Sequence, residues 1–409
     1  MGAKICALGE QMSDNKLSRG QRLLIVFTGL RNITDLFLGA FLISFIMQRA
    51  TNQIVSVSMY QLFHFTAVCF GFFAFAHWCK RYNKVSVFAL NIVPKIILLA
   101  SIVYLGDRVV DYVIPLGFIY GLGSAMYHLP RNLMVGEQVP SDLMPHFISS
   151  QNIVSYIVKI VAPITLGLFI TAGSYTGMAC VLLVVSCIEL LLSFMLTPSR
   201  HRTRAPLDFS GFFRCMMRFS VIKSMFGIEI LRGFAIGLLD TVIPMFTVYM
   251  FKTDLNLGMF TTLFAIMSIL ASYVIGRFSK ESQTRHIIRG CMLVIILGMA
   301  IFVGWTTPGT FLIYNFVYAT AIVMLNQICE SKMFQLSHSK CITANHKIEY
   351  FVFRDFALFL GRWVGFVGLM YIGTFGDYSW LRWYLVLISL ALVAYGIGVL
   401  RLNLRTRRK

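Results

Sequence analysis

Acidic residues are scarce in this sequence: 17 Asp and Glu stand against 36 Lys and Arg, and charged residues make up only 13% of the 409 residues. Hydrophobic residues make up 57%, and the mean hydropathy is +0.75. A water-soluble fold of this size needs more charge on its surface, which excludes most classes of soluble enzyme. The composition predicts an integral membrane protein with room for about 12 helices of roughly 20 apolar residues each.

Sequence motifs for several kinds of chemistry are also missing. The nine cysteines form no Cys-x-x-Cys pair and no Cys/His ligand spacing, so we expect no metal site, no cofactor and no structural disulfide. There is no Walker motif, and neither the His-Glu-x-x-His nor the Gly-x-Gly-Asp pattern of intramembrane proteases occurs. We therefore expect a membrane protein that is not an enzyme.

Long apolar runs divide the chain into twelve predicted spans. They are helical in length, because barrel strands would be about half as long and would alternate apolar and polar residues. The predicted spans are 23–47, 54–78, 85–105, 112–130, 147–171, 175–197, 224–251, 256–276, 290–306, 309–328, 348–373 and 379–400. The fold class expected is therefore an all-α polytopic membrane protein.

A polar stretch in the middle of the chain separates the spans into two groups of six. The predicted parts are an N-terminal segment, an N-terminal half, a linker, a C-terminal half and a basic tail, at 1–22, 23–197, 198–223, 224–400 and 401–409. Aromatic, Met and basic residues alternate from Phe209 to Phe226, which predicts an amphipathic segment against anionic lipid.

The basic residues predict the orientation of the chain. If the N-terminus is cytoplasmic and each span crosses the membrane, only Arg49, Arg108, Lys252 and Arg382 fall in outer loops. Most of the other Lys and Arg fall on the cytoplasmic side, as the positive-inside rule requires. We expect both termini and the linker to be cytoplasmic, and membrane lipids rather than nucleic acid to be the partners of this basic chain.

Weak internal repeats relate the two halves. Gly29-Leu30-Arg31 in the first span and Ile230-Leu231-Arg232 in the seventh differ by 201 positions, and Gly167 and Gly368 differ by the same number. Such a common offset is typical of transporters built from two repeats. The sequence thus predicts two pseudo-symmetric halves.

At this point the chain resembles the major facilitator superfamily. The resemblance covers almost the whole length and rests on the 6+6 arrangement, the basic central loop and two basic turns, at Gly71 with Lys80-Arg81 and at Gly276-Arg277. Those turns stand where the family carries a Gly-x-x-x-Asp-Arg-x-Gly-Arg-Arg motif, although neither has its Asp. The resemblance implies that these five residues belong to gating loops, and that two halves rock about a site near the midplane.

Ionisable residues within the spans are the candidate functional groups, since each costs a few kcal/mol at the bilayer centre unless it is paired or hydrated. Arg31 and Asp35 stand one helical turn apart, Glu229 and Arg232 can pair at i, i+3, and Lys159 is the sole charge of its span. The family's geometry places these spans around the cavity. The candidate substrate-binding residues are Arg31, Lys159, Arg232, Arg354, Tyr120, Tyr127, Asn152 and Asn326.

Asp35 and Asp240 are the candidates for proton coupling, Asp35 first, because its protonation would release Arg31. The alternative for all of these charges is an interhelical salt bridge that fixes packing. For Lys95 and Glu189, in spans that the family places at the back, the prediction is a mutual structural pair or snorkelling of the side chains.

The function predicted is secondary active transport of a small organic solute, anionic or amphipathic, coupled to protons. The chain is expected to be a monomer in the cell membrane. Three alternatives stay open: a lipid or glycolipid flippase, a hydrophobic drug exporter, and a membrane sensor of the same fold that does not transport. The identity of the solute and the direction of transport are open as well.

Overall fold

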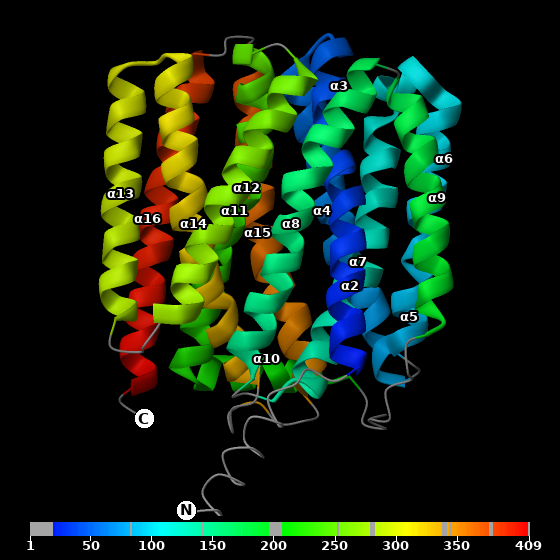
Figure 1. The fold of residues 1–409 in the computed structure, drawn as a ribbon. Coiled ribbons are helices and arrows are strands. Elements are labelled where there is room, and N and C mark those ends of the chain that lie inside the picture. Colours follow the sequence, from blue (N-terminus) through cyan, green and yellow to red (C-terminus); the bar gives the residue numbers. More distant parts are fainter. Residues whose placement is uncertain are drawn as a thin grey trace, which may run out of the picture.

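The computed structural model describes residues 19–81, 84–140, 143–172, 174–195, 207–251, 253–278, 283–337, 342, 346–375 and 379–407. Regular structure within those ranges is helical throughout. The long helices run side by side along one axis and form a bundle (Figure 1). The predicted N-terminal segment therefore lies mostly outside the described residues, as do the first part of the linker and the last residues of the tail.

The N-terminal half begins with a crossing that contains a π-helical turn. Its elements are α2 (Arg19–Leu36), η1 (Phe37–Phe41), α3 (Leu42–Arg49), α4 (Gln53–Arg81), α5 (Lys84–Leu90), α6 (Ile92–Leu105), η2 (Gly106–Tyr112), α7 (Val113–Gln138), α8 (Met144–Ala172) and α9 (Tyr175–Ser193).

A short helix outside the bundle, α10 (Phe209–Arg218), belongs to the linker and precedes the C-terminal half. The elements of that half are α11 (Ser220–Phe251), α12 (Asp254–Phe278), α13 (Thr284–Gly304), α14 (Pro308–Ser337), α15 (Lys347–Gly373) and α16 (Ser379–Arg407).

Eleven helical stretches among the described residues are long and apolar enough to span a membrane. One of them, Lys84–Gln138, is 55 residues long and contains two crossings, because the chain reverses within it. Gly106 ends α6 with a φ of 53°, a conformation that favours glycine, and α7 then packs back against α6 (Figure 1). With this stretch counted twice, the described helices give the twelve crossings predicted.

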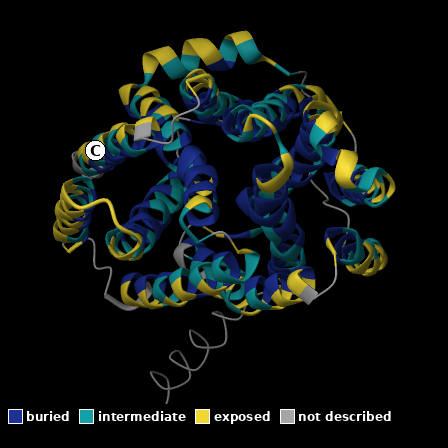
Figure 2. Ribbon diagram, turned by 90° about the horizontal axis from the view of Figure 1, so that it is seen from above, coloured by how far each residue is buried: buried dark blue, intermediate teal, exposed yellow. Residues whose placement is uncertain are grey.

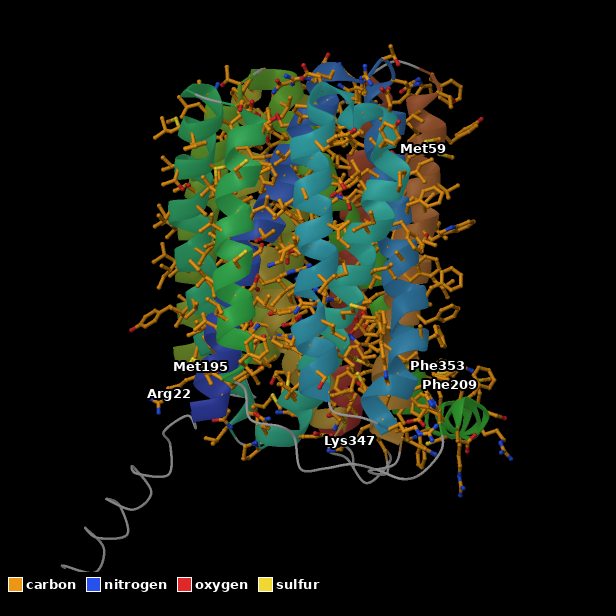
Figure 3. The ribbon with its side chains drawn as sticks, turned by 90° about the vertical axis from the view of Figure 1, so that its right-hand side faces the viewer. Arg22, Met59, Met195, Phe209, Lys347 and Phe353 are labelled. Atoms are coloured by element: carbon orange, nitrogen blue, oxygen red, sulfur yellow. The ribbon has the colours of Figure 1, made fainter. Side chains whose placement is uncertain are left out.

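The first and the last described residues lie at the same end of the bundle. The beginning of α2 and the end of α16 are there in Figure 1, and Arg22, Phe209 and Lys347 lie there in Figure 3, whereas Met59 lies at the other end. We call these the terminal end and the opposite end. An even number of crossings requires this arrangement.

The outside of the bundle is apolar and exposed. Seen from above, buried residues gather in the interior and exposed residues lie mainly on the rim (Figure 2). Among the exposed side chains are Val184, Leu191 and Leu293. In a membrane such a rim faces lipid chains, and the helices satisfy their own backbone hydrogen bonds.

Glycines set the spacing of the helices that border the interior. An ideal Cβ on Gly361 of α15 would lie 2.0 Å from the carbonyl oxygen of Ile230 in α11, and one on Gly233 of α11 would lie 2.2 Å from that of Leu358. No larger side chain fits at such distances. The backbones of α11 and α15 therefore touch, which fixes the wall on which several charged residues are mounted.

Candidate transport cavity

Two adjoining chambers lie between the halves. The first has a volume of about 410 Å³, and Arg131, Glu330 and Arg354 are among its lining residues; we call it the polar chamber. The second has a volume of about 520 Å³ and is lined by more apolar side chains, including Leu36 and Phe264; we call it the apolar chamber. Volumes of this size suit a small organic molecule.

The chambers share a set of lining residues from both halves. Helices α2, α4, α7 and α8 contribute to it from one side, and α11, α14 and α15 from the other. The shared residues include Asp35, Tyr120, Lys159, Asp240, Asn326 and Arg362. We call the level of these residues the waist of the cavity. The predicted ligands Arg31, Tyr127, Asn152, Arg232 and Arg354 line the polar chamber.

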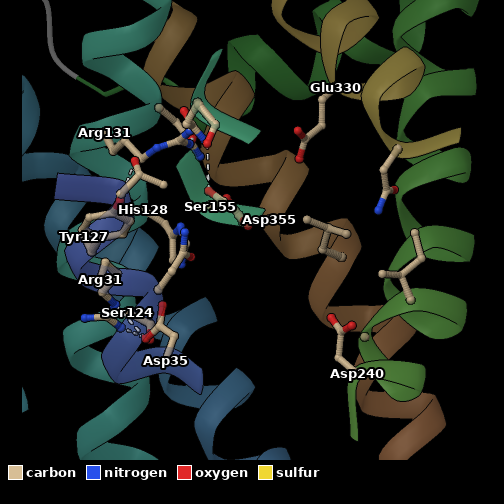
Figure 4. Close-up of a pocket in the computed structure, with 18 of the residues that line it drawn as sticks. Arg31, Asp35, Ser124, Tyr127, His128, Arg131, Ser155, Asp240, Glu330 and Asp355 are labelled. Atoms are coloured by element: carbon tan, nitrogen blue, oxygen red, sulfur yellow. Dashed lines mark hydrogen bonds and ion pairs between the residues drawn. The ribbon is translucent and has the colours of Figure 1, made fainter. Parts of the chain in front are cut away.

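A buried arginine organises the N-terminal wall. Arg31 is 2% exposed, and its Nε lies 2.8 Å from Asp35 Oδ1 in an ion pair. Its Nη2 donates to Ser124 Oγ at 2.9 Å, and the Tyr120 hydroxyl donates to Asp35 at 3.1 Å. Tyr127 also contacts the guanidinium, with its ring centroid 5.3 Å away. Arg31 and Asp35 thus pair with each other, as their spacing allowed, and Figure 4 shows this cluster on one side of the pocket.

The C-terminal wall carries a second network of charges. Glu229 is fully buried and faces both Arg232 and Arg354, each at 3.4 Å. Arg232 also lies 2.7 Å from Glu330, and Arg354 lies 3.9 Å from Asp355. Arg232 and Arg354, both predicted to bind substrate, therefore have carboxylate partners from α11, α14 and α15. A solute would have to compete with those partners.

Three charged groups at the waist have no opposite charge within 4 Å among the described residues: Lys159, Asp240 and Arg362. Lys159 and Asp240 are exposed to the cavity, and Lys159 Nζ lies 5.7 Å from the Tyr156 ring centroid. The Arg362 guanidinium lies 4.2 Å from the centroid of Phe65. These are the charges that remain for a ligand to match.

Sequence reasoning missed Arg131 as a cavity residue. The predicted span ended at residue 130, but α7 continues to Gln138 and carries Arg131 into the lining of the polar chamber. Its Nη1 donates to Asn132 at 3.0 Å and its Nη2 to Gln151. Arg131 stands one turn after Tyr127, and this helical spacing was the signal that could have revealed it.

Glu330 was missed for the same reason. The predicted tenth span ended at residue 328, whereas α14 continues to Ser337. Glu330 stands one turn after Asn326, so both line the polar chamber from one helix face. Asn326 was predicted to bind substrate, and its Oδ1 lies 3.3 Å from the hydroxyl of Tyr395, which donates to it. In Figure 4 Glu330 and Asp240 lie across the pocket from Arg31 and Asp35.

The predicted gating residues lie in three kinds of environment. Gly71 is a packing position, since an ideal Cβ there would lie 2.5 Å from Ala125 Cβ of α7. Lys80 is buried near the terminal end of α4 and forms an ion pair with Glu349 of α15, in the other half; Arg81 follows it as the last residue of α4. Gly276 and Arg277 belong to the last turn of α12, and the side chain of Arg277 is outside the described part of the chain.

Lys95 and Glu189 form a mutual pair, the first of the two alternatives predicted for them. Lys95 Nζ in α6 contacts Glu189 Oε2 in α9, and both side chains are buried. These helices lie side by side at one edge of the bundle (Figure 1), and neither residue lines the polar or the apolar chamber. In the described residues, no three His, Cys, Asp or Glu side chains are grouped as metal ligands.

Comparison with known proteins agrees with this architecture. A relative in Bacillus subtilis (strain 168), the uncharacterized protein YqgE, is 19% identical over 376 residues, which cover 89% of this chain and 85% of the relative. Among solved structures, a bacterial homologue of the iron transporter ferroportin in an outward-facing state with soaked iron is similar with a TM-score of 0.69 and 12% identity. That alignment covers 94% of this chain and 99% of the other.

Two further structures share the fold. The human organic anion transporter MFSD10 (TETRAN) has a TM-score of 0.67 and 10% identity, covering 95% of this chain and 99% of its own. A POT family transporter in complex with 5-aminolevulinic acid has a TM-score of 0.67 and 12% identity, and the alignment covers 95% of this chain and 96% of the other. The family model of the Major Facilitator Superfamily matches residues 24–338, which is more than half of the sequence. The chain therefore belongs to the Major Facilitator Superfamily of transporters.

Proposed function

We propose that this chain is a secondary active transporter that moves a small amphipathic solute with an anionic group by alternating access, coupled to protons. The observation that carries the proposal is Lys159, a cation exposed to a cavity that both halves line, with no carboxylate within 4 Å among the described residues. A cation at this depth is stable where water or an anionic ligand surrounds it. The polar chamber suits the head of such a solute and the apolar chamber its hydrocarbon part.

Contacts between the halves at both ends of the cavity support alternating access. At the terminal end, Lys80 of α4 pairs with Glu349 of α15. At the opposite end, Asp254 of α12 accepts hydrogen bonds from Ser44 of α3, at 2.5 Å, and from Tyr175 of α9, at 2.8 Å. Access from either side requires one of these sets to separate.

Weakening the contacts at one end at a time tests this arrangement, because the two variants should change access to the cavity in opposite directions. Glu349→Gln is expected to open the terminal end more often, and Asp254→Asn the opposite end, because each removes the charge that holds its contact. The readout is the rate at which a thiol reagent modifies Asn152→Cys in the polar chamber from the terminal end: it should rise in Glu349→Gln and fall in Asp254→Asn. Equal shifts in the same direction would contradict the two-gate arrangement.

Asp35 is the residue proposed to couple transport to protons. Its side chain is 27% exposed and lines the waist, while Arg31 and Tyr120 hold its carboxylate. Protonation would cancel the attraction to Arg31 and free the guanidinium. Asp240 is the second candidate, since it is the carboxylate at the waist without a cation within 4 Å in the described chain.

Reconstituted vesicles test the function directly. Wild-type protein should accumulate a labelled amphipathic anion when a pH gradient is imposed, and Lys159→Gln should lose most of this uptake. Asp35→Asn should retain exchange of solute across the membrane but lose accumulation driven by the gradient, whereas Asp107→Asn, an exposed acid at the opposite end, should behave as wild type. Accumulation by Asp35→Asn with unchanged pH dependence would exclude the coupling role.

The apolar chamber is the observation that favours a lipid flippase as the second function. Leu36, Ile243, Phe264 and Ile322 line it, and such a wall can hold an acyl chain. The two functions separate in the same vesicles: a flippase moves a fluorescent phospholipid between leaflets, whereas a solute transporter leaves the lipid in place and takes up the anion.

A further inference from the structure

The waist of the cavity holds charges of both signs that do not touch. Lys159 belongs to α8 in the N-terminal half and Asp240 to α11 in the C-terminal half. Both residues line the polar and the apolar chamber and are exposed there, yet the two charged groups are more than 4 Å apart. The space between opposite charges can therefore admit a ligand that contacts both.

Two buried polar side chains of the apolar chamber, which Asp240 also lines, have no hydrogen-bond partner among the described residues. Asn315 is 1% exposed and neither its Oδ1 nor its Nδ2 is hydrogen-bonded; Tyr318 is 6% exposed and its hydroxyl is likewise unpartnered. They are one turn apart on α14 and both line the apolar chamber. Asp240 lines the same chamber from α11.

Leaving such groups unsatisfied is costly, because a buried donor or acceptor loses its water without a replacement. A ligand in the chamber would supply the missing partner. Within the apolar chamber the available acceptors include the Asp240 carboxylate, the Asn315 amide oxygen and the Tyr318 phenol oxygen. A protonated amine, with up to three N–H donors, is the group that matches this set.

Arg362 adds a second cation at the waist. Its Nε is buried without a hydrogen bond among the described residues, and its guanidinium lies over Phe65 of the other half. Gly237 of α11 makes room for it: an ideal Cβ there would lie 2.7 Å from Arg362 Cγ. With Lys159, this arginine offers N–H donors for a carboxylate or a similar anion.

We propose that the waist binds a zwitterionic solute, with its anionic group at Lys159 and Arg362 and its protonated amine at Asp240, Asn315 and Tyr318. An anion alone leaves Asp240 unmatched, and an amine alone leaves both cations unmatched. A dipolar solute satisfies both signs and bridges the two halves. The inference rests on the proposed transport function and narrows its substrate class.

Thermal unfolding of the purified full-length protein in detergent tests the site without any assay of transport. Two matched sets of probes differ only in charge: 5-aminopentanoate, pentanoate and pentylamine; and phenylalanine, 3-phenylpropionate and phenethylamine. A ligand that binds the folded state raises the unfolding midpoint. In at least one set the zwitterion should raise it more than either singly charged analogue at the same concentration.

Variants then test which residue binds which charged group of the solute. Lys159→Gln should remove the zwitterion's advantage over the amine, and Asp240→Asn its advantage over the acid, each with a loss of about 10- to 100-fold in affinity. Lys223→Gln and Asp107→Asn, both at exposed positions outside the cavity, are the matched controls and should keep the wild-type preference.

The inference is overturned if no zwitterion in either set stabilises wild-type protein more than its singly charged analogues. This comparison uses the wild type alone, so a variant that fails to fold does not affect it. Uptake of an anion into vesicles, with no preference for zwitterions in thermal unfolding, would support the transport function and contradict the zwitterion site. Stronger thermal stabilisation by a zwitterion in detergent, with no uptake of any probe into vesicles, would support the site and contradict the transport function.

Discussion

The buried pair Lys95–Glu189 offers the sharpest test of how charge stabilises this fold. Both side chains are buried between α6 and α9, and only Oε2 of Glu189 contacts the lysine, while Oε1 has no hydrogen bond among the described residues. Replacing one partner, as in Glu189→Leu, leaves the other charge alone in an apolar environment. The pair is outside the cavity, so the effect falls on stability.

The magnitude follows from burial. Removing one partner of a buried ion pair typically costs about 3–5 kcal/mol, which is roughly 150- to 5,000-fold in the unfolding equilibrium. Removing both charges restores an apolar contact of similar volume, and such replacements are often neutral or stabilising. Lys95→Met and Glu189→Leu should therefore each destabilise the protein strongly, while the double variant should recover most of the loss.

The assay is unfolding of the purified variants in detergent, followed by circular dichroism or by loss of a monodisperse chromatography peak. The comparison is a double-mutant cycle, which isolates the interaction between the two residues. Single variants as stable as the wild type would show that the pair is hydrated or exposed. A double variant less stable than either single variant would show that each charge also stabilises the fold through contacts other than the ion pair. Either result would refute the reasoning.

Two further predictions concern topology and packing. In a background without native cysteines, an impermeant thiol reagent should label Asp107→Cys in intact cells but Ser210→Cys on α10 only after permeabilisation; the reverse pattern would place the termini outside. Gly361→Leu should destabilise the protein by about 1–3 kcal/mol or more, because even a Cβ would lie 2.0 Å from the Ile230 carbonyl oxygen, whereas Gly290→Leu, with nothing within 4 Å, should change the unfolding midpoint little.

The sequence by itself determined the class of the protein and the number of its crossings. Hydrophobic length is a local property, so each span could be predicted without knowing its neighbours, although α7 and α14 extend past the predicted ends at residues 130 and 328. Contacts within one helix were also predictable. Arg31 with Asp35, and Glu229 with Arg232, are a turn apart and pair as their spacing allowed.

Only the tertiary structure decided which charges remain for a ligand. Arg354 and Lys159 are both cations in spans that border the cavity, yet Arg354 faces Glu229 of another helix at 3.4 Å and Lys159 has no carboxylate within 4 Å in the described chain. That difference depends on the rotation and depth of each helix against its neighbours. Those quantities are set by close contacts such as Gly361 on Ile230, which join residues far apart in the sequence. A local pattern does not contain them.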